Sequence, residues 1–121
     1  MSQRASKSEE PKAKRLKWFF SDPKGSSCFT SLSVAVEDAP VHAVLRAESG
    51  KWHFLSEADV NGEEEGYAMS TLGFMVEHYP NLVPLYALEK KWAAVWDPST
   101  NFWQVFEAGE SWGRFVDRTK V

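Results

Sequence analysis

A short turn between two aromatic-rich segments constrains the fold of this chain most. Residues 91–96 (KWAAVW) and 101–107 (NFWQVFE) are rich in tryptophan, phenylalanine and valine, the residue types that favour strands. Residues 97–100 (DPST) separate them and place proline at the second turn position, where its restricted φ suits a type I turn. The sequence therefore predicts a β-hairpin here, and with it a sheet that contains antiparallel strands.

Three further segments predict more strands. Residues 41–48 and 51–56 flank Ser49 and Gly50, and because glycine reaches positive φ at low cost we expect a second hairpin. Residues 28–36 (CFTSLSVAV) alternate apolar and small polar side chains, which is typical of a strand. The sheet is therefore expected to contain strands from both halves of the chain.

The middle of the chain predicts one main helix. Its apolar face follows the spacing i, i+3, i+4, i+7 in Leu72, Met75, Val76 and Tyr79. Ser70 is a suitable N-cap, and Pro80 ends the helix. Hairpins with a helix between them are typical of the α+β class. We expect an antiparallel sheet built from hairpins with one main helix packed on a face.

Charge divides the 121 residues into two parts. Residues 1–16 are polar and basic without apolar periodicity, so we expect a disordered basic tail there, followed by a single α+β domain at 17–121. Residues 18–121 carry eight basic and fifteen acidic side chains, a net charge of −7. A domain of this charge does not bind nucleic acid by neutralising phosphates, but it attracts a basic partner.

Three features of the sequence bear on where the protein resides. The single cysteine, Cys28, forms no intramolecular disulfide, which is typical of a reducing compartment. No apolar run approaches the roughly 20 residues that span a membrane. The basic N-terminal segment is not followed by the apolar stretch of a secretory signal. We therefore expect a cytoplasmic protein without membrane contact.

The sequence contains no recognisable motif for catalysis or metal binding. HExxH, CxxC, GxSxG, GxGxxG and P-loop patterns are all absent. His42 and His53 fall on the two arms of the hairpin expected at 41–56, but a metal site there needs a third ligand. We expect no catalytic residue, no metal and no cofactor. An enzyme that pairs His42 or His53 with an acidic side chain is an alternative hypothesis.

The stretch from 51 to 85 resembles a known family. Ten residues carry the resemblance: Trp52, Phe54, Ser56, Glu57, Tyr67, Leu72, Gly73, Pro80, Leu82 and Leu85. They are similar to a motif of the immunity protein 33-type domain, a small bacterial family of polymorphic toxin systems. Ser56 departs from the family pattern, which has glycine there. The resemblance implies a protein that binds a cognate toxin and blocks it without catalysis of its own.

Residues 57–66 are the expected partner-binding segment. They have too few apolar side chains to pack, so we predict a solvent-facing loop with its turn at Asn61 and Gly62. We expect six residues to contact a basic protein partner: Glu57, Asp59, Glu63, Glu64, Glu65 and Trp103. The alternative is a small-molecule-binding or regulatory domain, in which the aromatic side chains line a pocket.

Overall fold

The computed structural model describes residues 17–64 and 66–116 of the chain. Within these residues, six strands form one sheet: β1 (Ser27–Ser31), β2 (Ala43–Arg46), β3 (Trp52–Leu55), β4 (Tyr67–Thr71), β5 (Trp92–Asp97) and β6 (Phe102–Glu107). Helical segments are α1 (Leu32–Glu37), α2 (Glu57–Val60), α3 (Leu72–His78), η2 (Pro80–Ala87), η3 (Glu110–Trp112) and α4 (Gly113–Val116). The predicted α+β class is confirmed, while the tail predicted at 1–16 lies outside the described residues. None of the described helices is long and apolar enough to cross a membrane.

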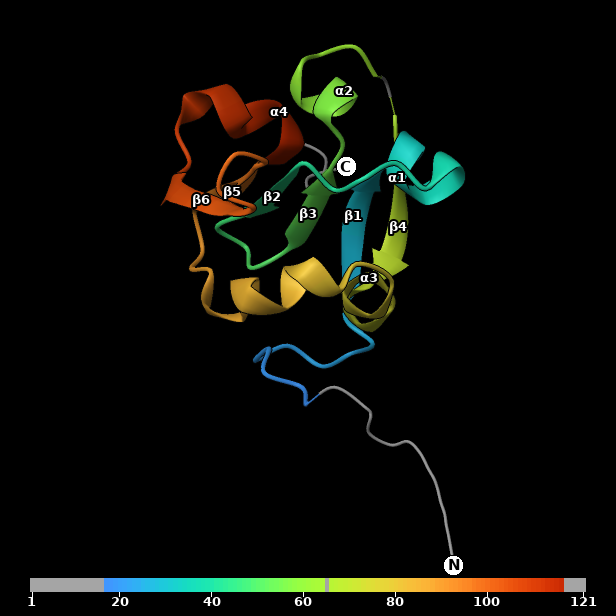
Figure 1. Cartoon of the computed structure of the whole chain (residues 1–121), viewed down its shortest axis with the longest axis vertical. Coiled ribbons are helices and arrows are strands. Elements are labelled where there is room, and N and C mark those ends of the chain that lie inside the picture. The colour runs from blue at the N-terminus through green and yellow to red at the C-terminus, as the bar shows by residue number, and fades with distance from the viewer. Residues whose placement is uncertain (1–16, 65, 117–121) are drawn as a thin grey trace, which may run out of the picture.

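The strands lie side by side in the order β4-β1-β3-β2-β5-β6 (Figure 1). The two predicted hairpins are confirmed as the antiparallel pairs β2–β3 and β5–β6. β1 and β3 are parallel, with Phe29 opposite His53 and Thr30 opposite Phe54. The expectation that hairpins alone build the sheet is therefore wrong at this pair. A parallel pair needs a crossover connection, which α1 and β2 supply here.

Both faces of the sheet are buried, which explains why β2 and β3 are almost continuously apolar. On one face, α3 and η2 pack on a core that includes Val44, Trp52 and Phe54. On the other face, Leu45 contributes to a smaller cluster that includes Phe115 of α4. In Figure 1, α3 and the gold η2 lie below the strands, whereas α1 and α2 lie above them.

The strand predicted at 28–36 ends at Ser31, and the chain continues as the helix α1. Val34 is buried in this helix, whereas Leu32 and Val36 are 37% and 76% exposed. The apolar alternation over these positions therefore does not mark one face of a strand. Asp38 ends the helix with a φ of 60°, in the left-handed region that aspartate tolerates better than most residues.

A helix forms at the predicted position as α3, but as one of several short helical segments, so the expectation of one main helix on the sheet is not confirmed. Three residues of its apolar face are buried: Leu72, Met75 and Val76. Its N-cap is Thr71 and not the predicted Ser70, because the Thr71 hydroxyl accepts a hydrogen bond from the Phe74 N–H at 3.3 Å. Ser70 belongs to the edge strand β4, whose half-buried and exposed residues gave no apolar pattern. With only seven residues, α3 is the longest α-helix among the described residues, and η2 follows almost directly.

Gly73 lets the N-terminal segment cross α3 at close range. The Gly73 N–H donates to the carbonyl oxygen of Lys24 at 2.8 Å, and a Cβ on Gly73 would lie only 2.9 Å from the Lys24 Cβ. The same segment carries Phe20 into the core, where its ring lies edge-on to Trp52 with 5.4 Å between centroids. Close packing thus accounts for a glycine inside a helix, where it costs about 1 kcal/mol relative to alanine.

Cys28 is fully buried in β1. Burial is the main reason that the pKa of its thiol is raised to about 12. The thiol is therefore protonated at neutral pH, and the thiolate form that attacks electrophiles is scarce. This placement agrees with a structural cysteine.

Candidate functional site

The carboxyl ends of the parallel strands β1 and β3 lie at one end of the sheet. Residues 57–66, here called the acidic segment, begin there. β1 ends at Ser31 and continues as α1, while β3 ends at Leu55 and continues through Ser56 into α2. Residues of α1 and α2 line the same hollow, and Figure 1 shows both helices at this end of the sheet. The parallel pairing thus brings two distant parts of the sequence together.

Two serine hydroxyls join these strand ends to the acidic segment. The Ser31 hydroxyl donates to the Asp59 carboxylate and accepts a hydrogen bond from the Ser56 N–H at 3.0 Å. The Ser56 hydroxyl accepts from the Asp59 N–H at 3.1 Å, which makes Ser56 the N-cap of α2. All three residues are buried. The prediction of a solvent-facing loop over 57–66 is therefore wrong for its first turn, which is helical and packed.

Glu64 fixes the other end of the segment to the same region. Its carboxylate accepts hydrogen bonds from the Ser33 N–H at 2.6 Å, the Ser33 hydroxyl at 2.8 Å and the Ser56 hydroxyl at 2.7 Å. Burial acts to raise the pKa of Glu64, but the hydrogen bonds from Ser56 and Ser33 outweigh it, so that the pKa lies below its ordinary value. The segment is thus held at both ends against α1 and β3.

We expect Glu64 to make the stability of the domain depend on pH in acid. Because its pKa is lower in the folded than in the unfolded chain, its contribution is complete above the unfolded pKa of about 4.3 and is lost as the pH falls through the folded value. The free energy of unfolding should therefore fall more for the wild type than for Glu64→Gln between roughly pH 6 and pH 3. Urea denaturation at both pH values measures this difference, and equal losses in the two proteins would contradict the role of Glu64.

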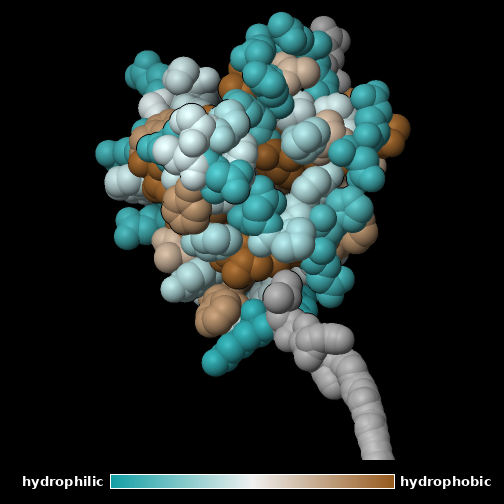
Figure 2. Space-filling model, in the orientation of Figure 1, coloured by the Kyte–Doolittle hydropathy of each residue, from teal (hydrophilic) through white to brown (hydrophobic). Residues whose placement is uncertain are grey.

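Exposed carboxylates and exposed apolar side chains surround this fixed segment. A hollow of about 440 Å³ is lined by Leu32, Val36, Glu37 and Glu63, among others. An adjoining hollow of about 330 Å³ shares Glu37 and adds Glu57. We call these five exposed residues the acidic surface. Figure 2 shows the corresponding upper and right-hand part of the molecule as mainly hydrophilic with hydrophobic side chains between.

Among the described residues, no cation pairs with the carboxylates of the acidic surface. The described residues that line the two hollows include no lysine or arginine. In the part of the chain that the structure describes, no ion pair involves Glu37, Glu57 or Glu63. The described residues also contain no group of three or more His, Cys, Asp or Glu side chains that could hold a metal ion. This charge is therefore available to attract a positively charged molecule.

Two of the predicted contact residues, Asp59 and Trp103, are buried. Asp59 is 0% exposed and accepts a hydrogen bond from the Ser31 hydroxyl. Trp103 is 4% exposed in β6. The Trp103 Nε1 donates to the carbonyl oxygen of Asn81 at 2.8 Å, so even its polar atom is occupied within the fold. Neither side chain is presented to a partner, which corrects the expectation for these two residues. Their positions assign them to the stability of the domain.

The other four predicted contact residues differ in exposure. Glu57 and Glu63 are exposed, Glu64 is half-buried by its serine contacts, and Glu65 lies outside the described residues. Contact with a partner stays a prediction for all four. Sequence reasoning missed five residues around them: Ser31, Leu32, Ser33, Val36 and Glu37. A serine three residues before an acidic residue, as in Ser56 and Asp59, is an N-cap signature that would have revealed α2.

The two histidines considered for catalysis lie in different surroundings. His53 is fully buried, opposite Leu45 in the sheet, and its ring is stacked on Phe29 with 5.0 Å between centroids. His42 precedes β2 and lines the 330 Å³ hollow together with Glu57. The hairpin does not bring the two imidazoles into one site. His53 is buried within the sheet, whereas His42 lies just before β2 and lines a hollow.

Comparison of the chain with protein-family models, with curated proteins and with solved structures gives no match. The resemblance to the immunity domain family therefore stays a prediction that rests on the sequence motif. Seven of the ten motif residues are buried: Trp52, Phe54, Ser56, Leu72, Gly73, Leu82 and Leu85. The motif accordingly describes mainly the packing of the core, and Glu57 is its one residue on the acidic surface.

Proposed function

We propose that this chain is a non-catalytic protein-binding domain, and that it neutralises a basic toxin by binding it through the acidic surface. One observation carries the proposal. Exposed Leu32 and Val36 lie beside the carboxylates of Glu37, Glu57 and Glu63, which have no basic neighbours in the described part of the chain. An apolar centre with a charged rim is the usual anatomy of a protein-binding surface.

The support beneath the acidic surface favours binding. Ser31, Ser56 and Glu64 hold the segment with hydrogen bonds to its first turn and to its far end. A segment that is ordered before the partner arrives loses less conformational entropy on binding. The proposed surface therefore needs no rearrangement of the segment to present its carboxylates.

The charge of the acidic surface favours a basic partner over a neutral one. Complementary charge raises the rate of association, and this effect weakens as salt screens the attraction. Toxins that act on nucleic acids carry basic surfaces, because they neutralise phosphates. A protein that blocks a toxin by binding to it needs no catalytic group of its own. The absence of catalytic motifs from the sequence fits this role.

The proposal is tested with two triple variants of equal charge change. Glu37→Gln, Glu57→Gln and Glu63→Gln together neutralise the acidic surface, whereas a control neutralises the exposed Glu89, Glu107 and Glu110 elsewhere. Affinity capture from the source cells at low salt should recover a stoichiometric basic protein with the wild type and with the control. The first variant should lose it or bind it about tenfold more weakly, as expected for several rim charges of up to 1 kcal/mol each. Equal capture by both variants would exclude the acidic surface as the binding site.

A further inference from the structure

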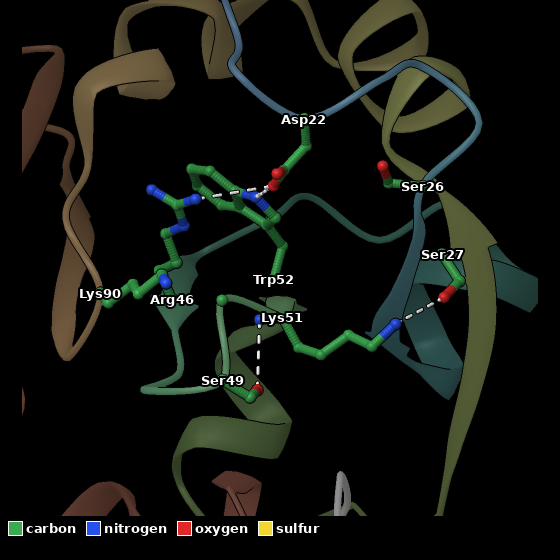
Figure 3. A pocket seen from close by; sticks show the side chains of 9 residues that line it. Asp22, Ser26, Ser27, Arg46, Ser49, Lys51, Trp52 and Lys90 are labelled. Atoms are coloured by element: carbon green, nitrogen blue, oxygen red, sulfur yellow. Dashed lines mark hydrogen bonds and ion pairs between the residues drawn. The ribbon is translucent and has the colours of Figure 1, made fainter.

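A cationic pocket lies at the amino ends of β1 and β3, at the opposite end of the sheet from the acidic surface. Its volume is about 350 Å³. Three basic side chains and three serine hydroxyls line it: Arg46, Lys51, Lys90, Ser26, Ser27 and Ser49. In Figure 3, Arg46 and Lys90 stand on one side, Ser26 and Ser27 on the other, and the Trp52 indole between them. The pocket is formed by the N-terminal segment, the β2–β3 turn and the turn before β5.

Arg46 is held in place in the wall of this pocket. Its Nη1 donates to the carbonyl oxygen of Leu88 at 2.9 Å, and its guanidinium carbon lies 5.0 Å from the centre of the Trp52 ring. Its Nη2 is 3.6 Å from Asp22 Oδ2, an oxygen that also accepts from the Trp52 Nε1 at 2.9 Å. These contacts fix the guanidinium plane before any ligand arrives, so little side-chain entropy remains to be lost on binding.

Lys51 contributes a second cation together with the serine hydroxyls. Its Nζ donates to the Ser27 hydroxyl at 2.8 Å, and its backbone N–H donates to the Ser49 hydroxyl at 3.3 Å. Both hydroxyls act as acceptors in these bonds, which leaves their own hydrogens to donate to a ligand. Lys90 lies at the rim, where its Cε is 3.5 Å from the position of a Cβ on Gly50.

The charge of the pocket is opposite to that of the domain. Three of the eight basic residues after position 17 line it, although residues 18–121 carry a net charge of −7. Among the described lining residues Asp22 is the one acidic side chain, so these residues give the pocket an excess of two positive charges. Concentrated positive charge in a hollow attracts an anion and raises its local concentration.

We propose that this pocket binds the phosphate group of a small phosphorylated molecule. A phosphate monoester carries a charge of about −1.5 to −2 at neutral pH and three strong acceptor oxygens, which matches two excess charges and donors on several sides. A carboxylate offers one charge and two oxygens in a plane, and would leave part of the pocket unpaired. The volume lies within the range of about 300–1,000 Å³ that is usual for small-molecule sites. This activity is separate from the proposed binding of a toxin.

The proposal is tested by NMR titration of the isotope-labelled full chain with inorganic phosphate, glycerol 3-phosphate and malonate. Both phosphates should shift the amide signals of Ser26, Ser27 and Lys51 and the indole signal of Trp52 to saturation. Lys51→Gln combined with Lys90→Gln should weaken phosphate binding at least about tenfold, because charged hydrogen bonds are lost. Lys91→Gln removes an exposed charge from the residue that follows Lys90 in the sequence. It should change the affinity less than about twofold, as expected for a screened surface charge.

Three results would overturn the proposal. The first is the absence of a saturable shift with either phosphate, and the second is an equal loss of affinity in Lys91→Gln and in the double variant. The third is tighter binding of malonate than of glycerol 3-phosphate, which would identify a dicarboxylate site. Thermal unfolding of each variant shows whether the fold is kept. Lys90 is exposed and Lys51 is half-buried, so we expect both variants to fold.

Discussion

Replacing Trp103 with alanine is expected to lower the free energy of unfolding by about 3–5 kcal/mol, the usual cost of removing a large buried aromatic side chain. Trp103 is 4% exposed, and its ring lies edge-on to Trp96 with 5.1 Å between centroids. The substitution leaves a cavity in the larger core cluster and removes the hydrogen bond to the Asn81 carbonyl oxygen. Urea denaturation followed by circular dichroism measures the change.

The neighbouring Phe102 is the matched control for this experiment. It is also aromatic and lies in β6, but 53% of it is exposed, because successive side chains of a strand point to opposite faces. Phe102→Ala should cost less than about 1 kcal/mol, as is usual for surface positions. Equal losses for the two variants would contradict the buried position of Trp103 and restore it as a candidate contact residue.

Replacing Ser56 with alanine is expected to cost about 2–4 kcal/mol. The hydroxyl caps α2, a role worth about 0.5–2 kcal/mol, and donates to the Glu64 carboxylate, a bond to a charged group worth about 1.5–3 kcal/mol. Because both ends of the segment depend on this oxygen, its loss should also loosen residues 57–64. Urea denaturation gives the stability, and hydrogen exchange of the amides of Asp59 and Glu64 reports the local loosening.

Ser111→Ala serves as the control for Ser56→Ala. Ser111 is exposed in η3, so the same removal of a hydroxyl should change the free energy of unfolding by less than about 0.5 kcal/mol. If Ser56→Ala lowers the free energy of unfolding without faster hydrogen exchange over residues 57–64, Ser56 stabilises the fold as a whole and does not order this segment. In that case the order of the acidic surface does not depend on the hydrogen bonds of the Ser56 hydroxyl.

The candidate site was only partly visible in the sequence, because its geometry depends on contacts between distant residues. The run of acidic residues marked the segment, and Glu57 and Glu63 are exposed as expected. Asp59 has the same side-chain chemistry but is buried in α2, where Ser31 at the end of β1 donates a hydrogen bond to it. Charge pattern alone does not tell an exposed carboxylate from one that is bonded inside the fold. The cationic pocket was not visible for the same reason, since Arg46, Lys51 and Lys90 converge only through the turns of the sheet.

Local sequence was sufficient for the elements that local physics controls. Both hairpins follow from turn residues next to strand-forming residues, and α3 follows from apolar spacing within a few turns. The parallel pairing of β1 with β3, the edge strand β4 and the switch from strand to helix at Ser31 depend on which distant segments pack together. Burial on both faces of the sheet then decides which side chains stabilise the fold and which remain for a partner. That choice depends on packing in three dimensions, which no window of neighbouring residues contains.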